Sequence, residues 1–258
     1  MGPHIIVCIK SVLVHAPMGR SVRTSDSCEL NPFDRPALEA ALRIKDEQGG
    51  SVTVISMGPD SVIFTLQEAI AMGTDRAILL SDPALADSDT LATSTALAAA
   101  IKKLAPFDLV LFGSRTADSD TGHVGPQTAI LLELPFLGGA YMIERKEKGL
   151  IIERKVDGFR ERFEVITPAA ITIHSSAFDP RDLNLTGIRF AYDEGDVEIW
   201  RLGELGLSPE QVGDAGSPTK VLSLSRVDRV RKCEFLSGST EEQATQLVQR
   251  LVETGTFF

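Results

Sequence analysis

The first 135 residues alternate between short apolar runs and longer segments with helical spacing, and this alternation constrains the fold more than any other feature. Runs of β-branched and apolar residues predict strands, whereas apolar residues spaced three and four apart predict helices. The predicted strands are 4–10, 51–58, 76–82 and 108–113, and the predicted helices are 36–48, 61–73, 89–105 and 125–135. Strands that are apolar throughout belong to parallel sheets covered by helices on both faces. The sequence therefore predicts an α/β fold with a mostly parallel sheet.

A different pattern begins near residue 138. Apolar and charged residues alternate over 140–166, with glycines at 149 and 158, which predicts an antiparallel meander. The apolar segment 168–176 predicts one more strand. We expect these strands to extend the same sheet or to cover its edge.

The last third of the chain is less regular. Turn residues follow Ser176 and lead to a short strand, and Gly, Ser and Pro are frequent over 202–220, which predicts a linker or an extended arm. An amphipathic helix is predicted over 239–255, with Ser239 or Thr240 as its N-cap. We therefore expect an α/β domain over 1–192 and a C-terminal arm over 193–258. Such an arm packs on a partner chain or remains a flexible tail, and packing on a partner is the simpler interpretation.

The composition excludes several classes of partner. The formal net charge is −10, whereas nucleic acids and acidic membranes bind basic surfaces, so neither is expected as a partner. No apolar run approaches the roughly 20 residues that span a bilayer, so direct membrane insertion is not expected. The apolar start of the chain is interrupted by Lys10 and is interpreted as a strand rather than a signal peptide. The three cysteines form no CxxC pair, which is typical of a reducing, cytoplasmic compartment and predicts no metal site.

Ligands of open α/β sheets bind beyond the carboxyl ends of the strands. The segments expected at that edge are 8–12, 56–60, 81–90 and 113–125, and 31–34 is suited to join them. Gly122 and Gly125 allow close approach of the backbone, and a helix that begins near Gly125 would direct free N–H groups at an anion. Thr90 and Thr93 offer hydroxyl groups. These features suit the phosphates of a nucleotide, but ordinary turn chemistry explains them equally well, and no P-loop or GxGxxG motif is present.

No catalytic constellation is apparent in the sequence. Asp118 and Asp120 lie too close together in one loop to act as a separated acid–base pair, and either is suited to cap the following helix. His123 alone is more typical of a surface histidine, and no Ser/His/Asp triad can be assembled. We expect a protein that binds or carries a cofactor, with no catalytic residues of its own.

Several motifs, in a consistent order and spacing, resemble the β subunit of electron transfer flavoprotein over nearly the whole chain. The stretches that carry the resemblance are VCIKSV (7–12), LNPFDRPALEAALRIKD (30–46), ISMGPD (55–60), EAIAMGTDRAILLSD (68–82), DLVLFGSRTADSDTGHVGPQTA (108–129), PAAITI (168–173) and DPRDLNL (179–185).

The resemblance implies a Rossmann-like, adenine-nucleotide-binding fold and a heterodimer with an α subunit. A redox-active FAD is held mainly by the α subunit, near the interface. The β subunit holds a second adenine nucleotide, which is AMP in the ordinary form of the family and FAD in the electron-bifurcating form. The implied function is electron transfer between an acyl-CoA-type or other flavin dehydrogenase and a downstream acceptor, and any NADH-dependent bifurcating oxidoreductase activity would require the partner proteins. The alternative is a non-redox adenine-nucleotide-binding module of the same α/β class.

The loop sequence bears on the choice between FAD and AMP. The ordinary form reads approximately D-D-D-x-N-Q-T-G, and the bifurcating form reads D-G-D-T-A-Q-V-G-P. This chain matches the second pattern at Asp118, Asp120, Thr121, Val124, Gly125 and Pro126. It departs from that pattern at Gly122 and His123, which replace Ala and Gln. The resemblance favours FAD over AMP.

The resemblance also assigns functional residues by position. The residues that the resemblance implies bind the β-site nucleotide are Cys8, Asn31, Met57, Gly58, Asp118, Asp120, Thr121, Gly122, His123, Val124 and Gly125. Thr90 and Thr93 would join them if the ligand is FAD. Main-chain groups at Cys8 and Gly58 would reach the adenine, and Asn31 would contact its edge or the ribose. Phe33 would approach the FAD of the α subunit, on which the arm would pack. The segment 179–192 matches the partner-recognition loop, with Leu185 at its apolar tip in acidic surroundings.

Overall fold

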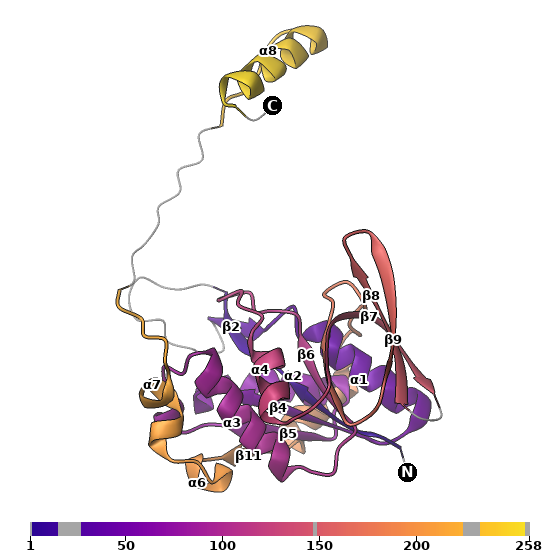
Figure 1. Cartoon of the computed structure of the whole chain (residues 1–258), viewed down its shortest axis with the longest axis vertical. Helices are drawn as coiled ribbons and strands as arrows, with labels where there is room; N and C mark the ends of the chain where they lie inside the picture. The colour runs from indigo at the N-terminus through magenta and orange to yellow at the C-terminus, as the bar shows by residue number, and fades with distance from the viewer. Residues whose placement is uncertain (1, 15–26, 147–148, 224–232, 256–258) are drawn as a thin grey trace. The chain divides into compact units, whose positions relative to one another are not determined.

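The computed structural model describes residues 2–14, 27–146, 149–223 and 233–255 (Figure 1). The chain divides into two compact units, one ending at Lys220 and one beginning at Val221. No helix among the described residues is both long enough and apolar enough to cross a bilayer.

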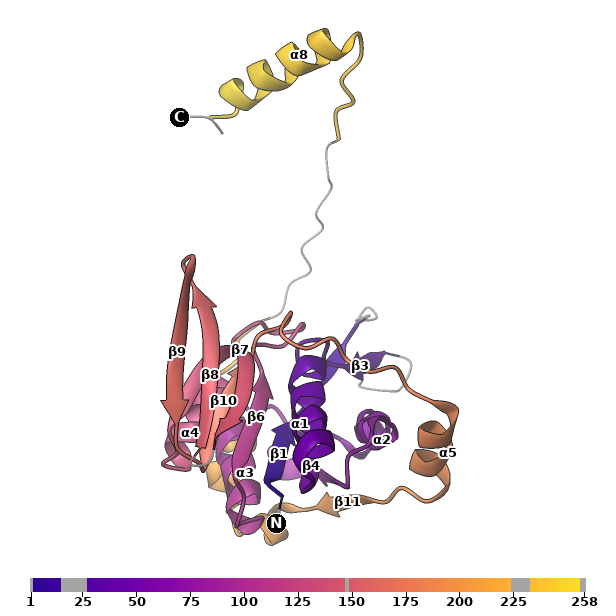
Figure 2. The ribbon, with the colours of Figure 1, turned by 90° about the vertical axis from the view of Figure 1, so that its right-hand side faces the viewer.

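The first unit is built on a nine-stranded sheet in the order β11-β5-β4-β1-β6-β10-β7-β8-β9. Its strands are β1 (His4–Cys8), β4 (Ser51–Met57), β5 (Arg76–Leu80), β6 (Leu109–Gly113), β7 (Phe136–Lys146), β8 (Gly149–Val156), β9 (Phe159–Val165), β10 (Ala169–Ile173) and β11 (Val197–Trp200). Neighbouring strands are parallel from β11 to β7, whereas β7, β8 and β9 pair antiparallel at the edge away from β11 (Figure 2). The predicted α/β fold, with a mostly parallel sheet and an antiparallel extension, is confirmed. A separate small hairpin pairs β2 (Ser11–Leu13) with β3 (Cys28–Leu30).

Helices cover both faces of the parallel part of the sheet (Figure 1). Side chains alternate between the two faces along a strand, so Ile5 and Val7 belong to one core cluster while Ile6 and Cys8 belong to the other. The first cluster contains the inner faces of α1 (Arg35–Gln48) and α2 (Ile63–Met72), and the second contains those of α3 (Thr90–Lys103) and α4 (Val124–Leu131). Burial on both faces is the reason that these strands are apolar throughout.

The segment after Ser176 is more regular than expected, because it forms the helix α5 (Leu185–Asp193). The side chain of Asn184 caps this helix by accepting the Gly187 N–H at 2.7 Å. Ala191 is fully buried against the core, so α5 is seated on the body of the domain. The prediction of irregular structure here was wrong, whereas the short strand predicted after it is present as β11.

The first unit continues beyond residue 192, where the sequence suggested that the arm begins. β11 pairs with β5 in parallel register, and Trp200 and Val212 are buried in the core. The short helical elements of this unit are α6 (Leu202–Leu205), α7 (Gly213–Gly216), η1 (Asp60–Val62), η2 (Pro83–Leu85) and η3 (Pro209–Gln211).

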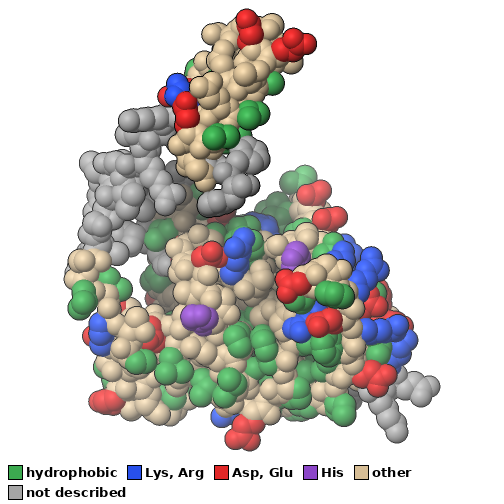
Figure 3. All heavy atoms as spheres, turned by 45° about the horizontal axis from the view of Figure 1, so that its top comes forward, with side chains coloured by type: hydrophobic (Ala, Val, Ile, Leu, Met, Phe, Trp, Pro, Cys, Tyr) green, Lys and Arg blue, Asp and Glu red, His purple; other side chains and the backbone are tan. Residues whose placement is uncertain are grey.

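The second unit contains the helix α8 (Thr240–Glu253). Ser239, one of the two predicted N-caps, caps the helix with Glu242: the Ser239 Oγ accepts the Glu242 N–H at 3.4 Å, and the Glu242 Oε2 accepts the Ser239 N–H at 2.7 Å. Hydrophobic side chains gather along one side of α8 (Figure 3), and Leu247, Val248 and Val252 are each about half exposed. The helix is therefore amphipathic, with an apolar face that its own unit does not bury.

Gly187 is expected to be essential for the seating of α5. A Cβ at this position would lie 2.3 Å from the Ala71 carbonyl oxygen of α2. Gly187→Ala should therefore lower the free energy of unfolding, measured by urea denaturation, by about 1–3 kcal/mol. Gly203→Ala is the matched control, because a Cβ at Gly203 in α6 meets no atom within 4 Å and alanine favours helix. Equal stabilities of the two variants would contradict the proposed packing.

Candidate functional site

The strand order reverses at β1, so the connections that follow β1 and β6 begin side by side at the carboxyl ends of these strands. The chain proceeds from β1 to β4 and β5 on one side and then crosses to β6 on the other side. Cys8, the last residue of β1, lies opposite Ile55 of β4 and Phe112 of β6. Ligands of open α/β sheets bind at such a reversal. The segments that leave β1 and β6 there are the β1–α1 connection and the loop 114–123.

These two segments are joined by specific contacts. The fully buried Asn31 donates from Nδ2 to the Arg115 carbonyl oxygen at 2.8 Å, and its Oδ1 accepts the Ala117 N–H at 3.2 Å. The Lys10 Nζ lies 2.7 Å from the Asp118 Oδ1, so the loop is also held by an ion pair. The Arg115 guanidinium lies 4.5 Å from the centre of the Phe33 ring, within cation–π range. The loop after β6 is thus fixed to the chain that leaves β1.

Asp34 lies beneath this junction, with only 5% of its surface exposed. Its carboxylate accepts the Lys10 N–H at 2.8 Å and also the Gly113 N–H. Burial outweighs these hydrogen bonds and raises the pKa of Asp34 to about 7. A Cβ at Gly113 would lie 2.2 Å from the Asp34 Oδ1, so the end of β6 requires glycine for this close approach.

The N-cap position of α4 is occupied by His123, whose side chain makes no hydrogen bond to the helix. The expectation that Asp118 or Asp120 is the N-cap residue was therefore wrong. Asp118 pairs with Lys10, and the Asp120 Oδ1 lies 3.2 Å from the Arg115 Nη1. The amides of the first turn and the positive end of the helix dipole therefore suit an anionic ligand.

The two glycines of the loop have different roles. Gly122 has a φ of +63°, and a Cβ there would lie 3.1 Å from the Ser114 carbonyl oxygen. Gly122 therefore allows the turn that leads into α4. A Cβ at Gly125 would lie 2.9 Å from the Thr172 Cγ2 of β10 and close to Phe112 of β6. Gly125 thus lets α4 approach the sheet closely, and its expected contact with a ligand stays a prediction.

Thr90 and Thr93 lie in the first turn of α3, beside the start of α4. The Ser94 Oγ hydrogen-bonds the Val124 carbonyl oxygen at 3.3 Å, which brings the two helices together. The Asp89 side chain caps α3 by accepting the amides of Leu91 and Ala92 at 2.9 and 3.0 Å. These amides of α3 are therefore already bonded, so the hydroxyls of Thr90 and Thr93 are the groups suited to a ligand.

Asp89 also holds the segment that leads out of the first unit. Its carboxylate accepts the Thr219 N–H at 2.9 Å, and its own N–H donates to the Ser217 Oγ at 2.8 Å. The Ser217 Oγ in turn donates to the Gly213 carbonyl oxygen at 2.6 Å. The end of the first unit is thus anchored at the start of α3.

The remaining predicted residues lie at the ends of β1 and β4. Cys8 is buried, which raises the pKa of its thiol far above the ordinary value and keeps it neutral. Met57 ends β4, and the N–H of the following Gly58 donates to the Leu80 carbonyl oxygen at 3.1 Å. The Gly58 amide is therefore bonded to β5, and the main-chain carbonyl of Gly58 is the group suited to adenine.

Three residues of the junction were missed by reasoning from the sequence. Lys10, Asp34 and Arg115 belong to segments that we expected at this edge, but their side chains were not assigned a role. Lys10 and Asp118 are 108 positions apart, and only the fold brings them within 2.7 Å. The sequence shows that these residues are charged, but it does not show which of them pair.

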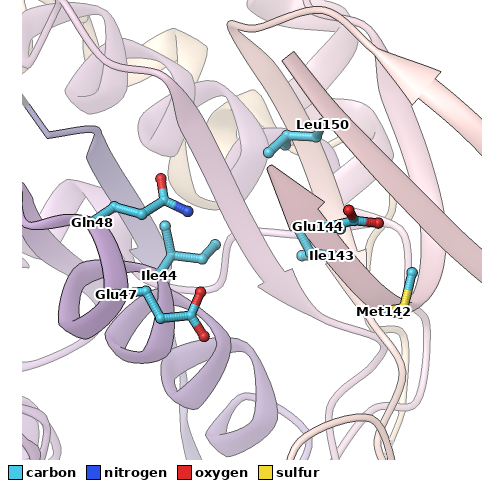
Figure 4. Close-up of a pocket in the computed structure, with 7 residues that line it drawn as sticks. All are labelled: Ile44, Glu47, Gln48, Met142, Ile143, Glu144 and Leu150. Carbon is cyan, nitrogen blue, oxygen red and sulfur yellow. The ribbon is translucent and has the colours of Figure 1, made fainter. Parts of the chain in front are cut away.

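A pocket of about 410 Å³ lies away from this junction, between the last turn of α1 and strands β7 and β8 (Figure 4). It is lined by Ile44, Glu47, Gln48, Met142, Ile143, Glu144 and Leu150. The last turn of α1 lies about 20 Å along the helix from Asp34. None of the residues predicted to bind the nucleotide lines this pocket.

The segment that precedes α5 is held on α1 by the buried carboxylate of Glu39. The Glu39 Oε2 accepts the Arg181 Nε–H at 2.8 Å and the Arg181 backbone N–H at 3.1 Å, and the Glu39 Oε1 accepts the Arg43 Nε–H at 2.8 Å. Burial acts to raise the pKa of Glu39, but the hydrogen bonds from both arginines outweigh it and hold that pKa below its usual value. Leu185, at the start of α5, is 85% exposed. The segment that Glu39 holds on α1 therefore leads to an exposed Leu185.

The chain is similar to known proteins over most of its length. The family model described as electron transfer flavoprotein domain matches residues 20–196. The chain is 40% identical over 222 residues to "Electron transfer flavoprotein subunit beta" of Thermoanaerobacterium thermosaccharolyticum, covering 86% of this chain and 85% of the relative. It is 39% identical over 257 residues to "Caffeyl-CoA reductase-Etf complex subunit CarD" of Acetobacterium woodii, covering 96% and 98%. It is 36% identical over 231 residues to "Protein FixA" of Azotobacter vinelandii, covering 84% and 82%.

Asp34 is expected to make stability depend on pH near neutrality. Because its folded-state pKa of about 7 lies above the value of about 3.9 in an unfolded chain, its contribution to stability is present below pH 4 and lost as the pH rises through 7. The free energy of unfolding of the wild type should therefore fall relative to that of Asp34→Asn as the pH rises from 5 to 8. Urea denaturation of both proteins across this range measures the change.

Asp60→Asn provides the control for this measurement. Hydrogen bonding to Arg201 holds the pKa of the exposed Asp60 below its usual value, so this residue stays ionised throughout the range from pH 5 to pH 8. The difference between wild type and Asp60→Asn should be constant there. A constant difference for Asp34→Asn would refute the assignment.

Proposed function

The chain belongs to the electron transfer flavoprotein family, and we propose that it acts as the β subunit of a heterodimeric electron carrier. The carrier would pass electrons from flavin dehydrogenases to a downstream acceptor. The observation that carries this proposal is the identity of about 40% to relatives named as subunits of such proteins, over most of the chain. No comparison favours the alternative of a non-redox adenine-nucleotide-binding module. We place the carrier in the cytoplasm, where the free thiols of Cys8, Cys28 and Cys233 would remain reduced.

The junction of β1 and β6 is the proposed site of an adenine nucleotide. The start of α4 would face its phosphates, and the ammonium of Lys10 and the guanidinium of Arg115 offset the charges of Asp118 and Asp120. The hydroxyls of Thr90 and Thr93, beside α4, would extend the site toward a longer ligand. These groups support a nucleotide at this junction through their charge and hydrogen-bonding capacity.

We favour FAD over AMP as this nucleotide. The loop sequence from Asp118 to Pro126 follows the pattern of the bifurcating form, and one relative is named as a subunit of a caffeyl-CoA reductase–Etf complex. A bound FAD would supply a redox centre, whereas AMP would be structural. In both cases the residues of this chain would orient the ligand and exclude water from its phosphates. Electron bifurcation would further require a suitable partner subunit.

The α subunit would bind through two features of this chain. The apolar face of α8 suits packing on a second chain, because Leu247, Val248 and Val252 are about half exposed within their own unit. Phe33, held by the Arg115 guanidinium, would approach the FAD of the α subunit. Neither feature requires this chain to change its own fold.

The segment around Leu185 would dock a flavin dehydrogenase. Phe190 and Tyr192 of α5 are also exposed, at 48% and 63%, and add apolar surface. Asp182 and Asp193 are acidic neighbours in sequence, so the complementary surface would combine an apolar hollow with basic residues. An acyl-CoA dehydrogenase with such a surface would fit.

The nucleotide content of the purified heterodimer tests the cofactor assignment. Acid extraction followed by chromatography should release two FAD per heterodimer. One FAD and one AMP would identify the ordinary form of the family and overturn the preference for FAD in the β site. A colourless, monomeric preparation after co-expression with the α subunit would contradict the proposed function itself.

Leu185→Ala tests the docking surface. The rate of electron transfer from an acyl-CoA dehydrogenase, reduced by its acyl-CoA, should fall at least about tenfold at limiting carrier, because burial of a leucine contributes roughly 1.5–3 kcal/mol. Thr186→Ala, at an exposed position of the same helix, should retain the wild-type rate. Equal rates for the two variants would exclude Leu185 from the docking surface.

A further inference from the structure

The chain that leads into α5 is held by one face of α1. Residues 178–184 lie between β10 and α5, and we call them the leading segment. Three side chains of α1 hydrogen-bond it or its arginine, and they belong to Glu39, Arg43 and Asp46. Their spacing of four and three residues places them on the same side of the helix. A single helix therefore determines where the leading segment lies.

Glu39 binds Arg181 through its main chain as well as its side chain. The Glu39 Oε2 accepts the Arg181 backbone N–H at 3.1 Å. The guanidinium bridges both carboxylate oxygens, with Nε at 2.8 Å from Oε2 and Nη2 at 3.3 Å from Oε1. Such a fork fixes the direction of the arginine side chain in addition to its distance. The three bonds together restrict both the backbone and the side chain of Arg181.

The burial of Glu39 makes this link specific. Only 3% of the residue is exposed, so its carboxylate is not available to a partner protein. A buried carboxylate is costly unless it is paired and hydrogen-bonded. Besides Arg181, it accepts the Arg43 Nε–H at 2.8 Å, and the Arg43 Nη2 donates to the Asp179 carbonyl oxygen at 3.2 Å. Both arginines that neutralise Glu39 thus also hold the leading segment.

The other end of the leading segment is fixed on α2. Asn184 caps α5, and Gly187 packs against Ala71 of α2, beside which α5 lies (Figure 2). Only residues 182 and 183 separate Arg181 from Asn184, and the exposed Leu185 follows directly. A shift of Arg181 would therefore reach Leu185 with little slack in the chain.

We infer that Glu39 is a positioning residue for the docking of a flavin dehydrogenase: through Arg181 it holds the leading segment on α1 and so sets where Leu185 meets the partner. This inference rests on the proposed docking surface around Leu185. Because α1 begins two residues after Phe33, which is proposed to approach the FAD of the α subunit, the same helix would relate the docked partner to that flavin.

Steady-state kinetics of the purified heterodimer with a dehydrogenase reduced by its acyl-CoA test this role. Glu39→Gln replaces a carboxylate oxygen with an N–H donor that faces the donors of Arg181 and Arg43. The KM for the carrier should rise at least about tenfold while kcat changes less than about twofold. Reduction by dithionite, which requires no docking, should keep its wild-type rate. Glu47→Gln, at an exposed position of the same helix, is the matched control and should retain the wild-type KM.

A second variant and a double variant separate positioning from a general loss of stability. Arg181→Ala removes the same link from the side of the leading segment, where the side chain is partly exposed, and should raise the KM to a similar extent. It keeps the inference testable if Glu39→Gln does not fold. In the Leu185→Ala background, Glu39→Gln should raise the KM by less than about twofold, because Glu39 acts through Leu185.

Hydrogen exchange locates the change within the heterodimer. The Arg181 amide loses its acceptor in Glu39→Gln and should exchange about tenfold faster than in wild type. In Glu47→Gln its exchange should be unchanged.

Two results would overturn the inference. Effects of Glu39→Gln and Leu185→Ala that multiply in the double variant would show that Glu39 acts independently of Leu185. A raised KM with wild-type exchange at the Arg181 amide would show that Glu39 does not hold the leading segment. If Leu185→Ala alone leaves the KM unchanged, the proposed docking surface fails, whereas exchange at the Arg181 amide still decides whether Glu39 holds this segment.

Discussion

The parallel pairing of β1 with both β4 and β6 is the constraint on which the rest of the structure depends. It buries β1 on both faces and along both edges, and it forces the chain to reverse its direction of travel across the sheet at this strand. The connections that leave β1 and β6 must then diverge to opposite sides. The side chain of Asn31 and the ion pair between Lys10 and Asp118 join these two connections.

This junction is held by polar groups in a largely apolar setting. Asn31 and Asp34 are almost completely buried, and a buried polar group that lacks partners is costly. Their bonds to Lys10, Arg115 and Ala117 join segments that are distant in sequence, so the fold and the site depend on the same few contacts. The raised pKa of Asp34 shows that burial outweighs the hydrogen bonds to its carboxylate. The contacts at this junction are therefore sensitive to the protonation of Asp34.

The strands and the main helices could be predicted because local patterns carry their signal. The segment 51–58 is rich in β-branched and apolar residues, and its strand is buried over most of its length. Ser239, one of the two predicted N-caps, caps α8. The helix α5 could not be predicted in the same way, because it is short and its packing on α2 depends on the contact between Gly187 and Ala71. The edge of the sheet that holds the candidate site was predictable because the carboxyl ends of parallel strands meet at one edge. The ion pair between Lys10 and Asp118 and the orientation of Gly125 toward β10 were not, because both depend on tertiary contacts.

The anchoring of Thr219 by Asp89 has a mechanical consequence. Tension applied to the chain beyond Lys220 is transmitted first to the Asp89 carboxylate and the Ser217 hydroxyl, because these groups hold the last segment of the first unit. The same carboxylate accepts the amides of Leu91 and Ala92, so the load also reaches the first turn of α3 directly. The last residues of the first unit are thus tethered to a core helix by side chains as well as by the backbone.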